Sequence, residues 1–180
     1  MFASFMSCRV LALLSASLIF SGAALSGEPA DVTGFDIEGF KLGMTLEEVQ
    51  EKFPDFSFRE VKRKGGVVGY EGKFNEITAS FTSEKLGKKL FRILLMRIFK
   101  KKPDPYPIYM EYVKKYGRPD FSGRQMMSIN ACWGRCYGDE KRLEFSMTVV
   151  GFGAKPFPMT LTLEDPLLGK KNRELFKTKR

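Results

Sequence analysis

Histidine is absent from this chain of 180 residues, and its absence removes several kinds of catalytic site. Without an imidazole the chain has no Ser-His-Asp or Cys-His arrangement and no imidazole metal ligand. It also has no G-x-S-x-G segment and no Walker-type phosphate loop. We therefore predict a protein that is not an enzyme and has no catalytic residues, cofactor or metal site. Hydrolysis by two carboxylates stays open as an alternative, although Asp36, Glu71 and Asp139 have no spacing that unites them.

Charge is missing from residues 10–20, an apolar run that follows Arg9 and precedes small residues at 21–27. A basic start, an apolar core and an exit of small residues are typical of a secretory signal peptide. The run is shorter than the roughly 20 apolar residues that a membrane-spanning helix needs. We predict a signal peptide over residues 1–26 and a periplasmic or secreted protein, with an uncleaved membrane anchor as the alternative.

Cysteine occurs only three times, at Cys8, Cys132 and Cys136. Cys8 lies within the predicted signal peptide, so the exported chain keeps two cysteines, and an even number in an oxidising compartment favours a disulfide. Gly134 permits a tight turn between them, which makes a bond from Cys132 to Cys136 sterically feasible. Two free thiols are the alternative, and a redox site is less favoured because the spacing is C-x3-C rather than C-x2-C.

Acidic residues are fewer than basic ones, since 21 Asp and Glu face 30 Lys and Arg. The excess favours an anionic surface or an acidic partner, and solubility alone is the alternative. Nucleic acid is not an expected partner, because an exported protein rarely meets it. The candidate interaction residues are Lys62, Arg63, Lys64, Lys100, Lys101, Lys102, Trp133 and Arg135. For the tryptophan, a core position that covers the disulfide is the favoured interpretation over an exposed anchor.

A capping box at residues 45–48 marks the start of the first helix. The Thr45 hydroxyl can accept a hydrogen bond from the backbone N–H of Glu48, whose carboxylate can accept one from the N–H of Thr45. Pro54 disfavours helical geometry in the residue before it, so this helix is predicted to be short. Residues 35–42 alternate apolar and polar side chains and predict a half-buried strand before the helix.

The next segments are rich in Phe, Val, Ile and Thr. Residues 58–61, 67–74 and 77–82 are separated by turn-forming residues and predict an antiparallel meander.

Residues 90–99 fit two patterns. They could form a central strand with both faces largely buried, which their β-branched and aromatic residues favour, or a basic amphipathic helix lying on a membrane. We favour the strand.

A second helix is predicted between Asp104, which can cap its start, and Gly117, which can supply a left-handed cap at its end. Pro105 suits the first turn, and Pro119 prevents continuation. Strands are predicted to follow at residues 127–133, 142–151 and 159–163.

These elements predict an α+β fold in which an antiparallel β-sheet carries two short helices on one face. Similar segments, FPDF at 53–56 and YGRPDF at 116–121, lead from each helix into strands, so two degenerate helix–sheet units are an open alternative. The predicted organisation is a signal peptide at 1–26, a loose N-terminal arm at 27–34, a single domain at 35–168 and a basic C-terminal tail at 169–180 that frays.

The segment FKLGMTLEEV at 40–49 resembles the opening of small exported bacterial domains. These include the SmpA/OmlA outer-membrane assembly lipoproteins and the β-lactamase-inhibitor-like proteins. YGRP at 116–119, followed by Trp133 and Gly134, is similar to a pattern in uncharacterised periplasmic proteins. The resemblance implies a helix–sheet domain that binds proteins and has no catalytic centre.

We therefore expect an exported, non-catalytic binding or scaffold protein of the bacterial cell envelope whose partner is another envelope protein. The alternative is a peripheral protein that binds anionic lipid or lipopolysaccharide through its basic clusters.

Overall fold

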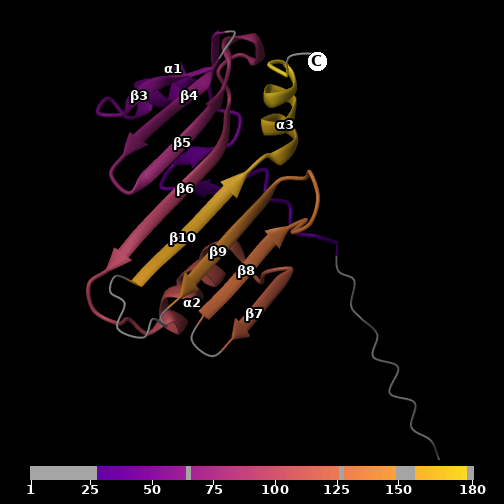
Figure 1. The fold of residues 1–180 in the computed structure, drawn as a ribbon. Coiled ribbons are helices and arrows are strands. Elements are labelled where there is room, and N and C mark those ends of the chain that lie inside the picture. The colour runs from indigo at the N-terminus through magenta and orange to yellow at the C-terminus, as the bar shows by residue number, and fades with distance from the viewer. Residues whose placement is uncertain (1–27, 64–65, 126–127, 149–156, 178–180) are drawn as a thin grey trace, which may run out of the picture.

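The computed structural model describes residues 28–63, 66–125, 128–148 and 157–177. The predicted signal peptide and Lys64 lie outside these ranges. The described residues form an eight-stranded antiparallel sheet, a two-stranded hairpin, three α-helices and a short 3-10 turn (Figure 1). The fold is α+β, as the sequence predicts.

The chain builds the sheet from two successive groups of elements. The first group contains β1 (Asp36–Ile37), β2 (Phe40–Lys41), α1 (Leu46–Lys52), β3 (Ser57–Arg63), β4 (Gly66–Phe74), β5 (Ile77–Thr82), the 3-10 turn (Glu84–Leu86) and β6 (Leu90–Phe99). The second group contains α2 (Pro105–Tyr116), β7 (Phe121–Gln125), β8 (Ser128–Gly134), β9 (Arg142–Thr148), β10 (Phe157–Glu164) and α3 (Pro166–Glu174). We call β3 to β6 the first half of the sheet and β7 to β10 the second half.

The strand order is β3-β4-β5-β6-β10-β9-β8-β7. Each of α1 and α2 leads into a four-stranded antiparallel meander, and the two meanders join through their last strands. In that junction Leu95 lies opposite Leu161, and Ile93 lies opposite Leu163. Two helix–sheet units placed side by side would give this symmetrical order, so the topology agrees with the repeat in the sequence.

The helix ends follow the local signals. The Thr45 hydroxyl accepts from the Glu48 N–H at 3.2 Å, and the Glu48 carboxylate accepts from the Thr45 N–H at 2.7 Å. Asp104 caps α2 by accepting from the N–H of Tyr106 at 3.0 Å. Gly117 ends α2 with a φ of 82°, in the left-handed region that favours glycine.

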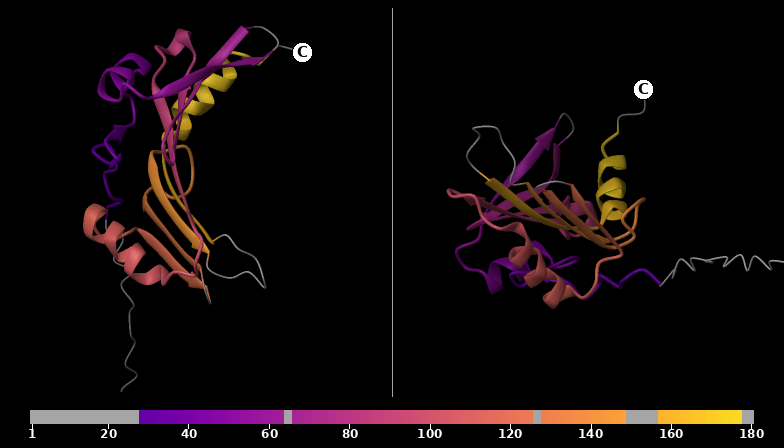
Figure 2. Two further views of the ribbon diagram at one scale, coloured as in Figure 1. Left: turned by 90° about the vertical axis from the view of Figure 1, so that its left-hand side faces the viewer. Right: turned by 90° about the horizontal axis from the view of Figure 1, so that it is seen from below.

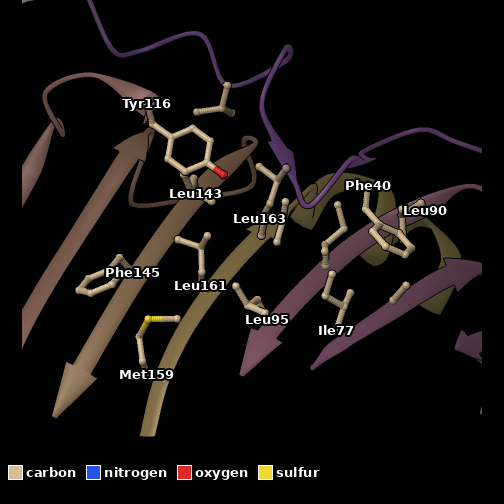
Figure 3. Packing of buried hydrophobic residues seen from close by; sticks show 14 of the residues in the cluster. Phe40, Ile77, Leu90, Leu95, Tyr116, Leu143, Phe145, Met159, Leu161 and Leu163 are labelled. Carbon is tan, nitrogen blue, oxygen red and sulfur yellow. The ribbon is translucent and has the colours of Figure 1, made fainter. Parts of the chain in front are cut away.

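The hydrophobic core lies on one face of the sheet, where α1, α2 and the β1–β2 hairpin cover it (Figures 2 and 3). Side chains alternate along a strand, so this face receives every second residue. On β10 the buried residues are Phe157, Met159, Leu161 and Leu163. Burial of one such side chain contributes about 1.5–3 kcal/mol, which fixes the face that each strand turns toward the helices.

We call the opposite face of the sheet the open face. In the left view of Figure 2 the sheet bends away from α1 and α2, so that the open face is concave, and α3 lies on part of it. Only α1 and α2 therefore match the predicted pair of helices on one face.

Residues 35–42 form a tight hairpin rather than the single strand predicted. Glu38 and Gly39 have φ values of 53° and 87°, and these left-handed conformations reverse the chain between β1 and β2. The alternating pattern concealed the turn, because glutamate rarely marks this conformation.

The N-terminal arm is attached over its described part rather than loose. Val32 is buried, and the Ala30 N–H donates to the Asp120 carboxylate at 3.1 and 3.2 Å. Asp120 also accepts from the Gly134 N–H at 2.7 Å, which ties the arm to the end of β8. A contact between residues 90 positions apart has no local signal in the sequence.

The predicted fraying of the basic tail is wrong for residues 169–174, which belong to α3. Asn172 is only 7% exposed. Its side chain accepts from the Ser83 N–H at 2.9 Å and donates to the Val68 carbonyl at 2.7 Å. Exposed Lys170, Lys171 and Arg173 give the segment its polar composition, and the buried amide anchors it to the sheet.

Two strand predictions also need correction. No strand is predicted over β7, where Ser122 and Gly123 have low strand propensity. Residues 90–99 do form a central strand, β6, so they are not an amphipathic helix. Its two faces are not both buried, however, because Met96 and Ile98 are 43% and 55% exposed.

Candidate functional site

The open face is mostly lined by hydroxyl side chains on three strands. These are Thr78 and Ser80 on β5, Ser146 and Thr148 on β9, and Thr160 and Thr162 on β10. An antiparallel sheet with one face toward water normally carries polar residues on that face. These three strands follow the rule.

β6 departs from this rule at three successive positions. Leu94, Met96 and Ile98 all point to the open face, and we call them the apolar stripe. The pairing register places them opposite uncharged residues of the neighbouring strands. Leu94 lies opposite Thr78 and Thr162, Met96 lies opposite Thr160, and Ile98 lies opposite Pro158. The apolar stripe therefore lies on a central strand and runs to its end, with uncharged side chains opposite it on β10.

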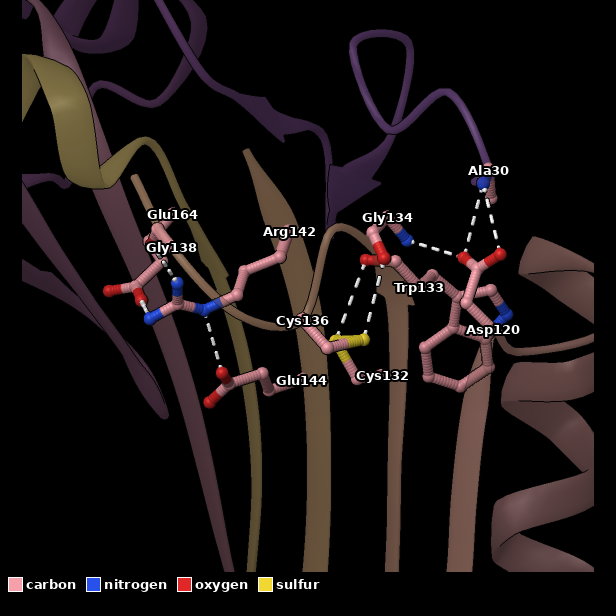
Figure 4. The surroundings of a disulfide bond; sticks show 10 residues. All are labelled: Ala30, Asp120, Cys132, Trp133, Gly134, Cys136, Gly138, Arg142, Glu144 and Glu164. Carbon is pink, nitrogen blue, oxygen red and sulfur yellow. Dashed lines mark hydrogen bonds and ion pairs between the residues drawn. A yellow bond between two sulfur atoms is a disulfide. The ribbon is translucent and has the colours of Figure 1, made fainter. Parts of the chain in front are cut away.

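Charged side chains border this uncharged region at one end. The Arg142 Nε lies 2.7 Å from Glu144, and the same guanidinium pairs with Glu164 (Figure 4). Glu164 also lies 3.9 Å from Arg92. An apolar centre with a polar, ion-paired rim is the usual anatomy of a protein–protein interface.

The predicted basic clusters are not brought together. The two clusters lie at opposite ends of the strands. Arg63, at the end of β3, lies at the end of the sheet where β6 begins, and Lys100 lies at the other end, directly after β6. Lys62 pairs with Glu60 at 3.0 Å. The described members of the two clusters are all exposed, namely Lys62, Arg63, Lys100, Lys101 and Lys102. Two separate basic ends result, rather than one continuous basic surface.

Trp133 lies on the core face of β8 and is fully buried. Its indole N–H donates to the Gly117 carbonyl at 2.8 Å, and its ring packs edge-on against Tyr116 at 6.0 Å between centroids. This side chain joins α2 to the sheet and has no surface for a partner. It does not cover the cysteines, because the adjacent Cys132 points to the open face.

Cys132 and Cys136 lie at disulfide-bonding distance, with their Cα atoms 5.9 Å apart (Figure 4). Gly134 makes the turn between them with a φ of 86°. A Cβ there would lie 2.8 Å from the Lys141 carbonyl oxygen, so only glycine fits. The neighbouring Arg135 is exposed and pairs with Glu140 at 2.8 Å.

The three carboxylates considered for hydrolysis lie beside different cations. Asp36 lies 3.3 Å from Lys115, Glu71 lies 2.7 Å from Arg59, and Asp139 lies 2.6 Å from Lys170. The hydrogen bond to Asp139 raises the pKa of Lys170. In the described ranges no three His, Cys, Asp or Glu side chains form a group that could hold a metal ion.

Comparison with family models, with curated proteins and with solved structures finds no match. No helix in the part of the chain that the structure describes is long and apolar enough to cross a membrane.

Proposed function

We propose that this protein is an exported, non-catalytic binding or scaffold protein of the bacterial cell envelope. In this proposal it contacts another envelope protein through the open face of its sheet. The observation that carries the proposal is the apolar stripe, which exposes Met96 and Ile98 of a central strand on the concave open face.

Single exposed apolar residues are common on protein surfaces and need no explanation. The apolar stripe is different, because its three residues are consecutive on one face and lie where the sheet would otherwise carry polar side chains. Removing water from this region is inexpensive, since the residues directly opposite the apolar stripe on β5 and β10 are uncharged. These properties favour a partner that inserts an apolar protrusion into the concave face.

Charge further restricts the partner. The chain carries a formal charge of +9, so an acidic protein would be attracted at long range. The ion pairs around Arg142 would lie at the rim of such a contact, where charges influence specificity more than affinity.

The two cysteines support export. A bonded pair between Cys132 and Cys136 requires an oxidising compartment such as the periplasm, and their Cα separation of 5.9 Å is suitable for that bond. The signal-peptide pattern at residues 1–26 agrees with this location.

Capture of partners from cross-linked envelope extract tests the proposal. The immobilised protein should retain a defined acidic envelope protein, and the double variant Met96→Asp/Ile98→Asp should lose it. Two charges placed in a contact that excludes water would be unpaired, which weakens binding strongly.

Met110 offers the matched control, because it is 39% exposed and lies on α2, across the sheet from the apolar stripe. Met110→Asp should retain the partner. The proposal fails if no protein is enriched, or if the open-face double variant and Met110→Asp retain the same proteins equally.

A further inference from the structure

A groove of about 490 Å3 lies on the open face between α3 and the edge hairpin β3–β4. This volume is within the roughly 300–1,000 Å3 typical of sites for small organic ligands. The groove belongs to the first half of the sheet and includes no residue of the apolar stripe. The groove is therefore separate from the surface proposed for the protein–protein contact.

Apolar side chains line much of the groove. Val61 and Val68 contribute from the edge hairpin, Phe91 from β6 and Phe176 from the segment after α3. Gly69 forms part of the floor, where a Cβ would lie 2.6 Å from the Phe81 carbonyl oxygen. A larger residue does not fit at this position, so the floor stays free of side chains there.

The helical wall of the groove is fixed in place. The Asn172 side chain bonds to both Ser83 and Val68, as described above. Gly169 lets α3 lie close to β6, because a Cβ there would be 3.0 Å from the Phe91 ring. The groove is thus a built feature between two anchored elements.

Basic residues predominate among the charged side chains of the groove. Arg59 pairs with Glu71 at 2.7 Å, and Lys62 pairs with Glu60 at 3.0 Å, so these charges balance. Arg63 and Arg173 also line the groove, and neither pairs with an acidic residue of the described chain. A ligand that completes this arrangement carries a negative group beside a hydrocarbon part.

We propose that the groove binds a long-chain carboxylate, a single-chain amphiphile of the fatty-acid type. The hydrocarbon chain lies between Val61, Val68 and Phe176, and the carboxylate pairs with Arg63 and Arg173. Guanidinium groups suit this role, because their planar N–H donors match the two oxygens of a carboxylate.

Isothermal titration of the purified protein with sodium dodecanoate, below its micelle concentration, tests this proposal. We expect saturable binding with one site per chain. Dodecanol should bind at least about tenfold more weakly, because it lacks the charge that pairs with arginine. Dodecyltrimethylammonium should not bind, and dodecyl phosphate should not bind more tightly than dodecanoate.

Substitutions locate the site. Ser80 lines the groove, so Ser80→Phe should fill it and abolish binding. Its control is Ser146→Phe, at an open-face position of β9 that does not line the groove. The double variant Arg63→Gln/Arg173→Gln should weaken binding at least about tenfold, and Lys100→Gln/Lys101→Gln, which removes equal charge at the other end of β6, should not.

Circular dichroism of each variant separates loss of binding from loss of fold, and the arginine variant decides the question if Ser80→Phe does not fold. Absence of saturable dodecanoate binding would overturn the proposal. Equal affinity for dodecanol and dodecanoate, or unchanged affinity in the double arginine variant, would overturn it as well.

Discussion

The two halves of the sheet are alike on the core face and different on the open face. Each half is a four-stranded meander preceded by a helix that covers its core face. On the open face α3 crosses the first half and leaves a groove beside β3 and β4. The second half carries the Cys132 and Cys136 pair at the end of β8. The apolar stripe on β6 lies at the junction between them.

The residues that build the fold lie on the core face, whereas those proposed to bind a partner or a ligand lie on the open face. The core face is shared by both units, because the β1–β2 hairpin lies against β6 and β10 and buries Ile37 and Phe40 in the same core that α1 and α2 cover. The open face is not constrained by that burial, so its residues can differ between the halves. Both proposed sites accordingly lie on the open face.

The largest change in unfolding free energy is expected from core substitutions, which also test whether the two halves of the sheet unfold together. Phe40→Ala removes a buried ring of β2 that packs against Phe74 of the first half, and Phe145→Ala removes one from the second half. Each should cost about 3–5 kcal/mol of unfolding free energy. Trp133 is the single tryptophan and lies in the second half, so its fluorescence reports that half, whereas circular dichroism reports both. Because β6 pairs with β10 along eight residues of β10, both probes should give one coincident transition in each variant.

If the fluorescence midpoint of Phe40→Ala stayed at the wild-type value while circular dichroism shifted, the halves would be independent units. The symmetrical sheet would then be two domains in contact.

A smaller effect is expected from the anchor of α3. Asn172→Ala leaves the Ser83 N–H and the Val68 carbonyl without their partner and should cost about 2–3 kcal/mol. Hydrogen exchange should accelerate in α3 and leave β8 and β9 protected. Asn130→Ala is the control, since Asn130 is exposed on the open face of the second half. Unchanged exchange in α3 would mean that other contacts hold this helix.

The cysteine pair should contribute about 2 kcal/mol, because it closes only a short loop. Cys132→Ser should lower Tm by several degrees, since 1 kcal/mol corresponds to roughly 2–4 °C in a domain of this size. Reductant should lower the Tm of the wild type similarly and leave the variant unchanged. Two alkylatable thiols in protein purified from the periplasm would contradict the bond.

The smallest effect concerns buried tyrosine. Burial raises the pKa of the Tyr116 phenol well above its usual range, and its hydroxyl donates to the Asp36 carbonyl at 2.5 Å. The unfolded chain ionises near pH 10, before the folded protein does, so stability should fall as the pH rises above about 10. Tyr116→Phe should cost about 1 kcal/mol at pH 7 and reduce this alkaline loss. An unchanged slope of stability against pH above 10 would contradict the assignment.

Local sequence signals predicted the helix ends and several strand boundaries well. The capping box at Thr45, the cap at Asp104 and the glycine at Gly117 act within a few residues, and all three helix ends lie where these residues require. The turn-forming residues likewise separated β3, β4 and β5 correctly. Such features need no knowledge of distant parts of the chain.

Distant contacts explain the errors. The arm is attached through Asp120, and Asn172 anchors α3 to β4 and the end of β5, and neither of these contacts has a local signal. The start of α3 does have one that could have been used. Asp165 caps it by accepting from the Leu168 N–H at 2.9 Å, and Pro166 occupies its first turn, the same pattern that predicted the start of α2. The apolar stripe has a signal that could have been used. Residues 90–99 are apolar on both faces of a strand, while only two helices were predicted, both on one face, so one apolar face had to stay uncovered.

Site-specific photo-cross-linking can show directly whether the open face contacts a protein partner. A diazirine amino acid placed at Met96 or at Met110 reports two positions of similar exposure on opposite faces of the sheet. We expect a discrete adduct with a second envelope protein from position 96 and none from position 110. Adducts of equal yield from both positions, or an adduct from position 110 alone, would contradict it.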